Sequence, residues 1–352
     1  MDFNDSPAEA AFRAEARAFL EAHAPKGGLP DYLAEHVDED AFLEAHRAWQ
    51  RTMYAHGWAA ITWPAEHGGR GAGPMEQIIW NQEKARVGIG ESLFVVGVGM
   101  AGPTIVAYGS EEQKKRYLPP MLRADEVWCQ LFSEPGAGSD LANVSTRAER
   151  DGDFYVVNGQ KVWSSSANHA DFGILLARTN PNVAKHKGIT YFLVDMKTPG
   201  VSVRPLRQMT GSSHFCEVFF EDARVPASAV LAGEGMGWAC AMTTLMNERM
   251  AMGGIDLMFN FDMLAEHARR NKDRVDGVMR DELARLYCWC RTMEFLNARM
   301  LTKMSRGENP MAEASIAKLA IARIVSKGAD LGLRLLGPDA LLRSGDWQNR
   351  FL

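Results

Sequence analysis

The feature of this sequence that most constrains its fold is a change of pattern in the middle of the chain. From about Val127 to Leu231, short runs of β-branched and aromatic residues alternate with polar turns, which is typical of strands. The clearest runs are residues 154–157, 173–177, 189–194 and 216–220. Several short strands separated by turns predict a small antiparallel sheet or barrel.

Helical periodicity covers the chain on both sides of these strands. The helices expected before them are residues 7–23, 40–56, one beginning near Pro74, and 111–122 with Ser110 as N-cap. Those expected after them are residues 237–270, 278–304 and 310–336, packed as an antiparallel bundle. The predicted fold is therefore mostly α with a small central antiparallel β domain. The predicted domains are a helical domain at 1–125, a β domain at 126–232 and a helical bundle at 233–352.

Length and composition exclude several classes of protein. The chain has 352 residues, 46% apolar and 24% charged, as in an ordinary globular protein. Its net charge of -5 gives no reason to expect nucleic acid or an anionic membrane as partner. No apolar run reaches the length of a membrane span, and the N-terminus has no pattern of a secretion signal.

The five cysteines lack the spacing of a disulfide framework, which favours reduced thiols and a cytoplasmic location. Cys288 and Cys290 lie only two residues apart, which is not the spacing of a zinc knuckle. We therefore interpret them as packing residues on a helix and expect no metal site.

A glycine-rich loop at residues 133–140 is the first part of a candidate ligand site. Gly136 and Gly138 allow the backbone to approach a ligand closely and leave amides free to face an anion or a carbonyl. Ser133 and Ser139 add hydroxyl groups at the two ends of this loop.

The second part follows in the segment that ends at Ser166. Asn158-Gly159 predicts a two-residue hairpin turn between two strands. The second strand would carry Trp163 and Ser165 on one face, because they are two residues apart. A flat ring beside a hydroxyl suits a planar, heteroatom-rich ligand, whereas the alternative is a solvent loop and a core tryptophan.

Another glycine pattern, at residues 97–102, has the formal GxGxxG spacing of a dinucleotide-binding fingerprint. It lacks a βαβ context, Pro103 follows it at once, and no strand with an acidic residue lies where a ribose contact would be needed. We interpret these glycines as points of close helix packing.

At residues 133–140 and 158–163 the sequence resembles the acyl-CoA dehydrogenase family, whose flavin-binding signature has the same two pieces at the same spacing. The resemblance extends from about Phe12 to Leu342. It implies that family's three-domain architecture, bound FAD, and α,β-desaturation of an acyl-CoA thioester in fatty acid β-oxidation. Desaturation requires a base for the α proton and an acceptor for hydride, and no amino acid accepts hydride.

The resemblance also implies roles for individual residues. Those that match the family's flavin and thioester contacts are Gln130, Phe132, Ser133, Gly138, Ser139, Trp163 and Ser165. By this resemblance, Trp163 would pack on the flavin ring and Ser165 would hydrogen-bond near its reactive nitrogen. Ser139 would lie between cofactor and substrate.

Two positions supply the catalytic carboxylate in this family. One lies in a loop ahead of a final helix, and we expect that loop and that helix to be missing from a sequence that ends at Leu352. The other immediately precedes an arginine on the first bundle helix, as in the isovaleryl and long-chain branches, and here it is Glu248 before Arg249. The resemblance therefore implies Glu248 as base, with Arg249 bracing the helix or contacting substrate. An exposed helix carboxylate is the alternative for Glu248, and Glu134 is expected to anchor the glycine-rich loop.

The resemblance further implies an electron-transfer flavoprotein as electron acceptor and FAD sites shared between subunits. The methionine-rich helices indicate a homodimer or homotetramer through residues 235–352. However, residues 268–274 lack the Phe-Gly pair that the family uses on a neighbouring subunit's FAD. Two alternatives therefore stay open: a non-catalytic or half-active subunit of a heteromeric enzyme, and an oxygen-using flavin oxidase or monooxygenase of the same fold.

Overall fold

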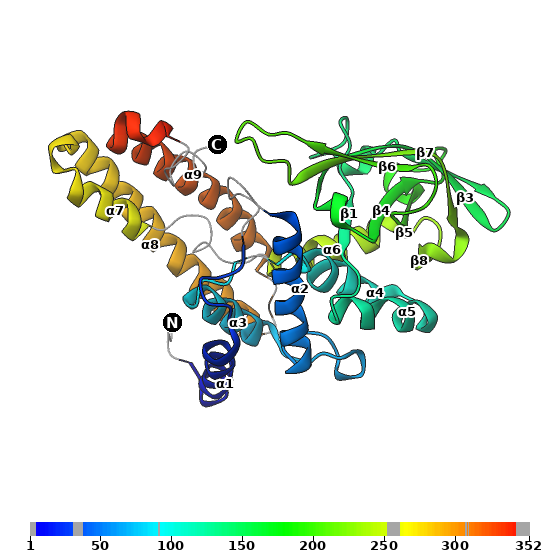
Figure 1. The fold of residues 1–352 in the computed structure, drawn as a ribbon, viewed down its shortest axis with the longest axis horizontal. Helices are drawn as coiled ribbons and strands as arrows, with labels where there is room; N and C mark the ends of the chain where they lie inside the picture. The colour runs from blue at the N-terminus through cyan, green and yellow to red at the C-terminus, as the bar shows by residue number, and fades with distance from the viewer. Residues whose placement is uncertain are drawn as a thin grey trace. The chain divides into compact units, whose positions relative to one another are not determined.

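The computed structural model describes residues 5–30, 38–90, 92–251, 261–306, 308 and 310–342 (Figure 1). The chain divides by packing into two compact units, each assembled from separate stretches of sequence. The helical unit comprises Met1–Ala24, Gly73–Gly90 and Gly253–Leu352, and the sheet unit comprises Pro25–Ala72 and Glu91–Met252. The three sequence domains at 1–125, 126–232 and 233–352 stay a prediction.

The helical unit is a set of packed helices. Its helices are α1 (Pro7–His23), α3 (Pro74–Arg86), α7 (Phe261–Arg270), α8 (Gly277–Ser305) and α9 (Met311–Leu336), with short 3-10 turns at Lys272–Arg274 and Gly337–Leu341. Buried residues seven positions apart, Leu286 and Met293 on α8 and Ile324 and Leu331 on α9, form its core. This spacing places each pair on one helix face, so the expected packing of the helices at 278–304 and 310–336 is confirmed, whereas residues 237–251 of the expected bundle belong to the sheet unit.

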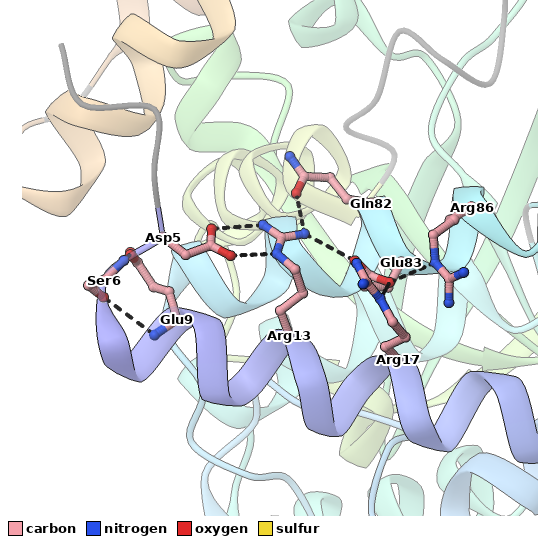
Figure 2. Close-up of polar contacts among 8 residues, drawn as sticks. All are labelled: Asp5, Ser6, Glu9, Arg13, Arg17, Gln82, Glu83 and Arg86. Atoms are coloured by element: carbon pink, nitrogen blue, oxygen red, sulfur yellow. Dashed lines mark hydrogen bonds and ion pairs between the residues drawn. The ribbon is translucent and has the colours of Figure 1, made fainter.

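A buried carboxylate fastens α1 to α3 within this unit. Figure 2 shows the Glu83 side chain surrounded by guanidinium groups, of which Arg17 and Arg86 each donate at 2.9 Å and Arg13 at 3.2 Å. The hydrogen bond from Arg17 is the largest of the contributions that lower the pKa of Glu83 to about 2. Because the carboxylate is only 3% exposed, it depends on these donors to remain ionised.

The sheet unit combines helices with an eight-stranded sheet (Figure 1). Its helices are α2 (Glu39–Ala55), a 3-10 turn (Ala65–His67), the π-helix η2 (Gly97–Ala101), α4 (Gly102–Tyr108), α5 (Glu111–Leu122), η3 (Leu141–Asn143), η4 (Ala167–His169), η5 (Lys185–Gly188), η6 (Ala227–Ala229) and α6 (Gly237–Ala251). Its strands are β1 (Trp128–Leu131), β2 (Arg147–Asp151), β3 (Phe154–Ser165), β4 (Phe172–Arg178), β5 (Ile189–Asp195), β6 (Val201–Leu206), β7 (Phe215–Pro226) and β8 (Val230–Leu231).

The strand order is β6-β7-β3-β2-β4-β5-β8, with β1 also paired to β4. The pairs are antiparallel except β1–β4 and a single contact between β2 and β4. Along β4, Ile174 and Leu176 join one buried cluster while Leu175 and Ala177 join another. Alternate residues therefore fill cores on both faces, and α4, α5 and α6 cover the first of these faces. The predicted fold class, mostly α with a small central β domain, is confirmed.

Helix starts were the most accurate local predictions. The Ser110 hydroxyl accepts from the amide of Gln113, whose side chain accepts from the Ser110 amide, so the expected N-cap of α5 is confirmed. The helix expected at 237–270 is described as α6 and α7, and residues 252–260 lie outside the described part of the chain. None of the described helices has the length and apolar character needed to cross a membrane.

The predicted hairpin turn at Asn158-Gly159 is wrong. β3 runs continuously through these residues, and the turn between β2 and β3 lies instead at Gly152, where φ is +58°. Gly159 has a φ of +153° at a register shift, and a Cβ added there would lie 2.5 Å from the Thr146 hydroxyl. Thus glycine is needed here because Thr146 approaches closely, opposite a bulge in β7, and not for a turn.

The glycines at 97–102 lie in helix and not in a nucleotide-binding loop. The π-helix η2 leads directly into α4. A Cβ on Gly97 would contact the Trp128 side chain at 3.5 Å, and one on Gly102 would collide with the ring of Trp63. The interpretation as close packing is therefore confirmed.

Candidate active site

A cavity of about 380 Å³ lies within the sheet unit, between the end of β1 with its following loop and one face of α6. The residues that line it from β1 and the loop are Gln130, Phe132, Ser133, Gly138, Ser139 and Leu141, and those from α6 are Trp238, Met242, Leu245 and Glu248. The four α6 residues recur every three or four positions, so they share one helix face. The structure thus brings five of the expected flavin and thioester residues and the expected base around one cavity.

The α6 wall of this cavity is apolar except for one carboxylate. Trp238, Met242 and Leu245 supply the apolar surface, and Glu248 lies partly buried one turn further along the helix. Arg249 belongs to α6, but its side chain lies outside what the structure describes. The cavity therefore combines an apolar wall with a single described acid on α6, facing the backbone and hydroxyl groups of the loop.

A buried ion pair holds the loop that forms the opposite wall. The Lys161 ammonium, fully buried on β3, donates to Glu134 Oε1 at 2.7 Å and to the carbonyl of Phe132 at 3.0 Å. Glu134 also accepts from the amide and hydroxyl of Ser145, both at 2.7 Å, and from the amide of Thr146 at 2.9 Å. The prediction that Glu134 anchors the loop is confirmed. The role of Lys161 was not predicted.

The electrostatics of this pair favour a carboxylate and an ammonium at neutral pH. Desolvation opposes ionisation of Glu134, but the charge and hydrogen bond of Lys161 and the donors of Ser145 and Thr146 lower its pKa to about 2. Burial lowers the pKa of Lys161 to about 8, although the carboxylate opposes this change. Glu134 is consequently a very weak base.

Trp163 and Ser165 lie near the end of β3, beside the loop but outside the cavity lining. The amide of Val162 donates to the carbonyl of Ser133 at 2.9 Å, which joins β3 to the loop. Trp163 has a φ of +61° and its side chain is 60% exposed, both unusual for a tryptophan. A ring held outward from a strained backbone position suits a stacking ligand. Ser164 is buried and Ser165 half-buried, as alternation after a bulge requires.

A second feature that sequence reasoning missed is the packing of η5 near the cavity. Lys185 pairs with Asp140 at 2.6 Å, next to the cavity-lining Ser139. The His186 ring packs edge-on against Trp238 at 4.6 Å. The basic run before Gly188 was a visible signal, but only tertiary structure brings it to this site.

Comparison with known proteins agrees with this fold and site. Sequence models of the acyl-CoA dehydrogenase N-terminal, middle and C-terminal domains match residues 6–125, 129–223 and 235–352. Acyl-CoA dehydrogenase IpdE1 of Mycobacterium tuberculosis is 36% identical over 97% of this chain and 90% of its own length.

Two solved structures are also similar. The structure titled "Tcur3481-Tcur3483 steroid ACAD" has a TM-score of 0.81 and 32% identity, covering 99% of this chain and 89% of that one. The ChsE4-ChsE5 complex from Mycobacterium tuberculosis has a TM-score of 0.79 and 30% identity, covering 100% of this chain and 92% of that one.

A three-part helix–sheet–helix chain with a carboxylate facing a glycine-rich loop defines a class of flavin-associated oxidoreductases. This chain belongs to the acyl-CoA dehydrogenase family. It is an oxidoreductase of the acyl-CoA dehydrogenase type.

Proposed function

We propose that this enzyme desaturates an acyl-CoA thioester between its α and β carbons, with FAD as cofactor and Glu248 as base. The observation that carries the proposal is the single cavity shared by Glu248 and the loop residues. The apolar side chains of α6 suit an acyl chain, because burying alkyl groups is favourable. The loop amides and hydroxyls suit a thioester carbonyl and a flavin edge.

The residues present fit a flavin. Gln130, Phe132, Ser133 and Gly138 would bind it from the end of β1 and the loop that follows, and Trp163 with Ser165 would bind it from β3. FAD supplies an acceptor for the hydride of the β carbon, which no side chain can provide. Ser139 would contact both cofactor and substrate, and Arg249 would brace the helix near the base or contact substrate.

In this proposal Glu248 removes the α proton, and that proton remains on its carboxyl oxygen. Glu134 cannot substitute for it, because the described hydrogen bonds to its carboxylate come from Lys161, Ser145 and Thr146, and its pKa is about 2. The apolar neighbours on α6 would keep bulk water away from the carboxylate during the transfer.

Replacement of Glu248 by glutamine tests the assignment. Glu248→Gln keeps size and hydrogen bonding but removes basicity, so anaerobic reduction of the flavin by acyl-CoA should slow by about 100-fold or more. Flavin content should stay near that of the wild type. Glu221→Gln, an exposed carboxylate on β7, is the control and should reduce at the normal rate. Near-native reduction by Glu248→Gln would mean that another residue or another chain supplies the base.

FAD binding has its own test. Trp163→Leu should weaken FAD binding by roughly tenfold, the scale of one lost aromatic contact. Phe154→Leu alters another exposed ring on the same strand, away from the loop, and should bind FAD normally. Equal FAD affinities for the two variants would contradict the role of Trp163.

We also propose a homodimer or homotetramer formed through residues 235–352, with an electron-transfer flavoprotein as acceptor and a cytoplasmic location. Large apolar side chains on the described part of this segment support assembly, because they are about half exposed or more. They include Trp289, Phe295, Ile316 and Leu319. Light scattering that gives a monomer at micromolar concentration would contradict the assembly.

A second candidate is a subunit that needs a different partner chain. Two similar structures favour it, because each is named for a pair of proteins. The missing Phe-Gly pair in residues 268–274 points the same way. If the chain purified alone binds FAD and is bleached by an acyl-CoA, this candidate is excluded.

A further inference from the structure

A chain of buried hydroxyl groups joins the helix that carries Glu248 to the sheet behind the cavity. Tyr191 on β5, Thr244 on α6 and Thr104 on α4 are all fully buried. The Tyr191 hydroxyl lies 3.0 Å from Thr244 Oγ1, which lies 2.9 Å from Thr104 Oγ1. Three elements that are distant in sequence therefore meet through hydroxyls in an otherwise apolar core.

The number of hydroxyl protons limits how the hydrogen bonds among these three side chains can be directed. Thr104 Oγ1 also lies 2.8 Å from the carbonyl of Met100, and Thr244 Oγ1 lies 3.0 Å from that of Cys240. Four contacts compete for three hydroxyl protons. Two arrangements use every proton and join all three elements. In the first, Tyr191 donates to Thr244, Thr244 to Thr104, and Thr104 to the Met100 carbonyl. In the second, Tyr191 and Thr104 both donate to Thr244, which donates to the Cys240 carbonyl. Each bond in such a chain polarises the next.

Burial keeps this chain intact across the physiological pH range. Desolvation raises the pKa of the Tyr191 hydroxyl, so it stays protonated and able to donate. A buried hydroxyl that loses its partner costs free energy, so α6 cannot rotate or slide against β5 and α4 without a penalty. Apolar contacts alone would not impose this restriction, because they are not directional.

Two residues of this hydroxyl chain, Thr244 and Tyr191, connect it to the two walls of the cavity. Thr244 precedes Glu248 by four residues, so both lie on adjacent turns of the same side of α6. The Tyr191 ring packs edge-on against Phe132 at 5.9 Å, and Phe132 lines the opposite wall. The hydroxyl chain thus connects the two walls through a continuous path of contacts.

We propose that Thr244 is a positioning residue, which acts through Tyr191 and Thr104 to fix the rotation of α6 and so the placement of the Glu248 carboxylate. This inference rests on the proposed role of Glu248 as base. Misplacement of a reacting group by about 1 Å can cost about 100-fold in rate, so loss of one directional bond should appear in proton abstraction.

The test compares matched hydroxyl variants of the FAD-loaded enzyme in anaerobic stopped flow, using the acyl-CoA thioester that bleaches wild-type flavin fastest. Thr244→Val has nearly the same shape, and its reduction rate constant should fall by about 10- to 100-fold. Its flavin content and apparent substrate dissociation constant should stay within about twofold. Thr244→Ser restores the hydroxyl and should recover the rate to within about threefold. Thr52→Val is the control, because the Thr52 hydroxyl donates to the Ala48 carbonyl of its own helix α2 at 2.9 Å, and this variant should react normally.

The Glu248→Gln background separates this inference from the proposed function. There Thr244→Val should add less than about a twofold effect, because it acts through the missing base. Suppose that Glu248→Gln reduces its flavin slowly. A normal reduction rate for Thr244→Val, or an equal fold-loss from Thr244→Val in the wild-type and Glu248→Gln backgrounds, would then overturn the positioning role alone. A near-native rate for Glu248→Gln would overturn the proposed base, and the positioning role with it. Should Thr244→Val not fold, Tyr191→Phe removes the first donor, and a near-native reduction rate in that variant would also overturn the inference.

Discussion

Replacement of Glu134 by glutamine should destabilise the sheet unit strongly, because it leaves the Lys161 ammonium buried without a counter-charge. Lys161 is completely buried, and its remaining acceptors would both be neutral: the Phe132 carbonyl at 3.0 Å and the amide oxygen of the new glutamine. Removal of one partner from a buried pair typically costs about 3–5 kcal/mol. The lysine can instead lose its proton, which from an unfolded pKa of about 10.4 costs roughly 4.6 kcal/mol at pH 7. Both routes predict a loss of about 4 kcal/mol.

The pH dependence of this loss gives a sharper test. Lys161 has a lowered pKa of about 8 in the folded wild-type protein. Above pH 8 the unfolded state therefore binds more protons than the folded state, and the free energy of unfolding rises with pH. In Glu134→Gln the pKa of Lys161 in the folded state should fall below 7, so the free energy of unfolding begins to rise at a lower pH than in the wild type. The stability deficit of the variant should therefore narrow between pH 7 and 8, by up to about 1.4 kcal/mol, and stay constant above pH 8.

Thermal melting followed by circular dichroism is the appropriate assay, with a decrease in Tm of roughly 10 °C expected at pH 7. The control is the double variant Glu134→Gln with Lys161→Met, which removes the uncompensated charge and should melt at a higher temperature than Glu134→Gln alone. A single variant within about 1 kcal/mol of wild type, or a double variant no more stable than the single one, would refute the reasoning.

Two further predictions concern packing and charge elsewhere. Glu83→Gln should cost about 2 kcal/mol at pH 7, because an amide accepts more weakly from Arg17 and the other guanidinium groups. Since the folded pKa of Glu83 is about 2, this stability is present above pH 4.5 and is lost as pH falls toward 2, so the melting curves of the two proteins should converge near pH 2. Gly102→Ala should cost about 1–3 kcal/mol in denaturant unfolding, because the added methyl collides with the Trp63 ring. Gly90→Ala, where nothing lies within 4 Å of the added methyl, is the control and should change stability by less than about 0.5 kcal/mol.

The sequence by itself determined the elements whose boundaries depend on neighbouring residues. The helix from Pro7 to His23 and the helix from Glu111 to Leu122 begin where the pattern predicted, because capping boxes at Ser6 and Ser110 satisfy their first amides locally. The family resemblance likewise identified five of the six lining residues that come from β1 and the glycine-rich loop, since these residues are close together in the chain. Interactions of this kind join residues that are close in sequence, so short segments of sequence are enough to predict them.

Only the tertiary structure decided the features that depend on distant partners. β2 has mostly exposed polar residues and is a strand because β3 pairs with it, and Gly159 has no room for a Cβ because Thr146, which directly precedes that strand, lies against it. Lys161 reads as an ordinary surface lysine until the fold buries it against Glu134. The hydroxyls of Thr104, Tyr191 and Thr244 have no common motif and meet only when three elements pack together. The physical reason is that hydrogen bonds and burial depend on distance in space, whereas sequence patterns report only neighbours along the chain.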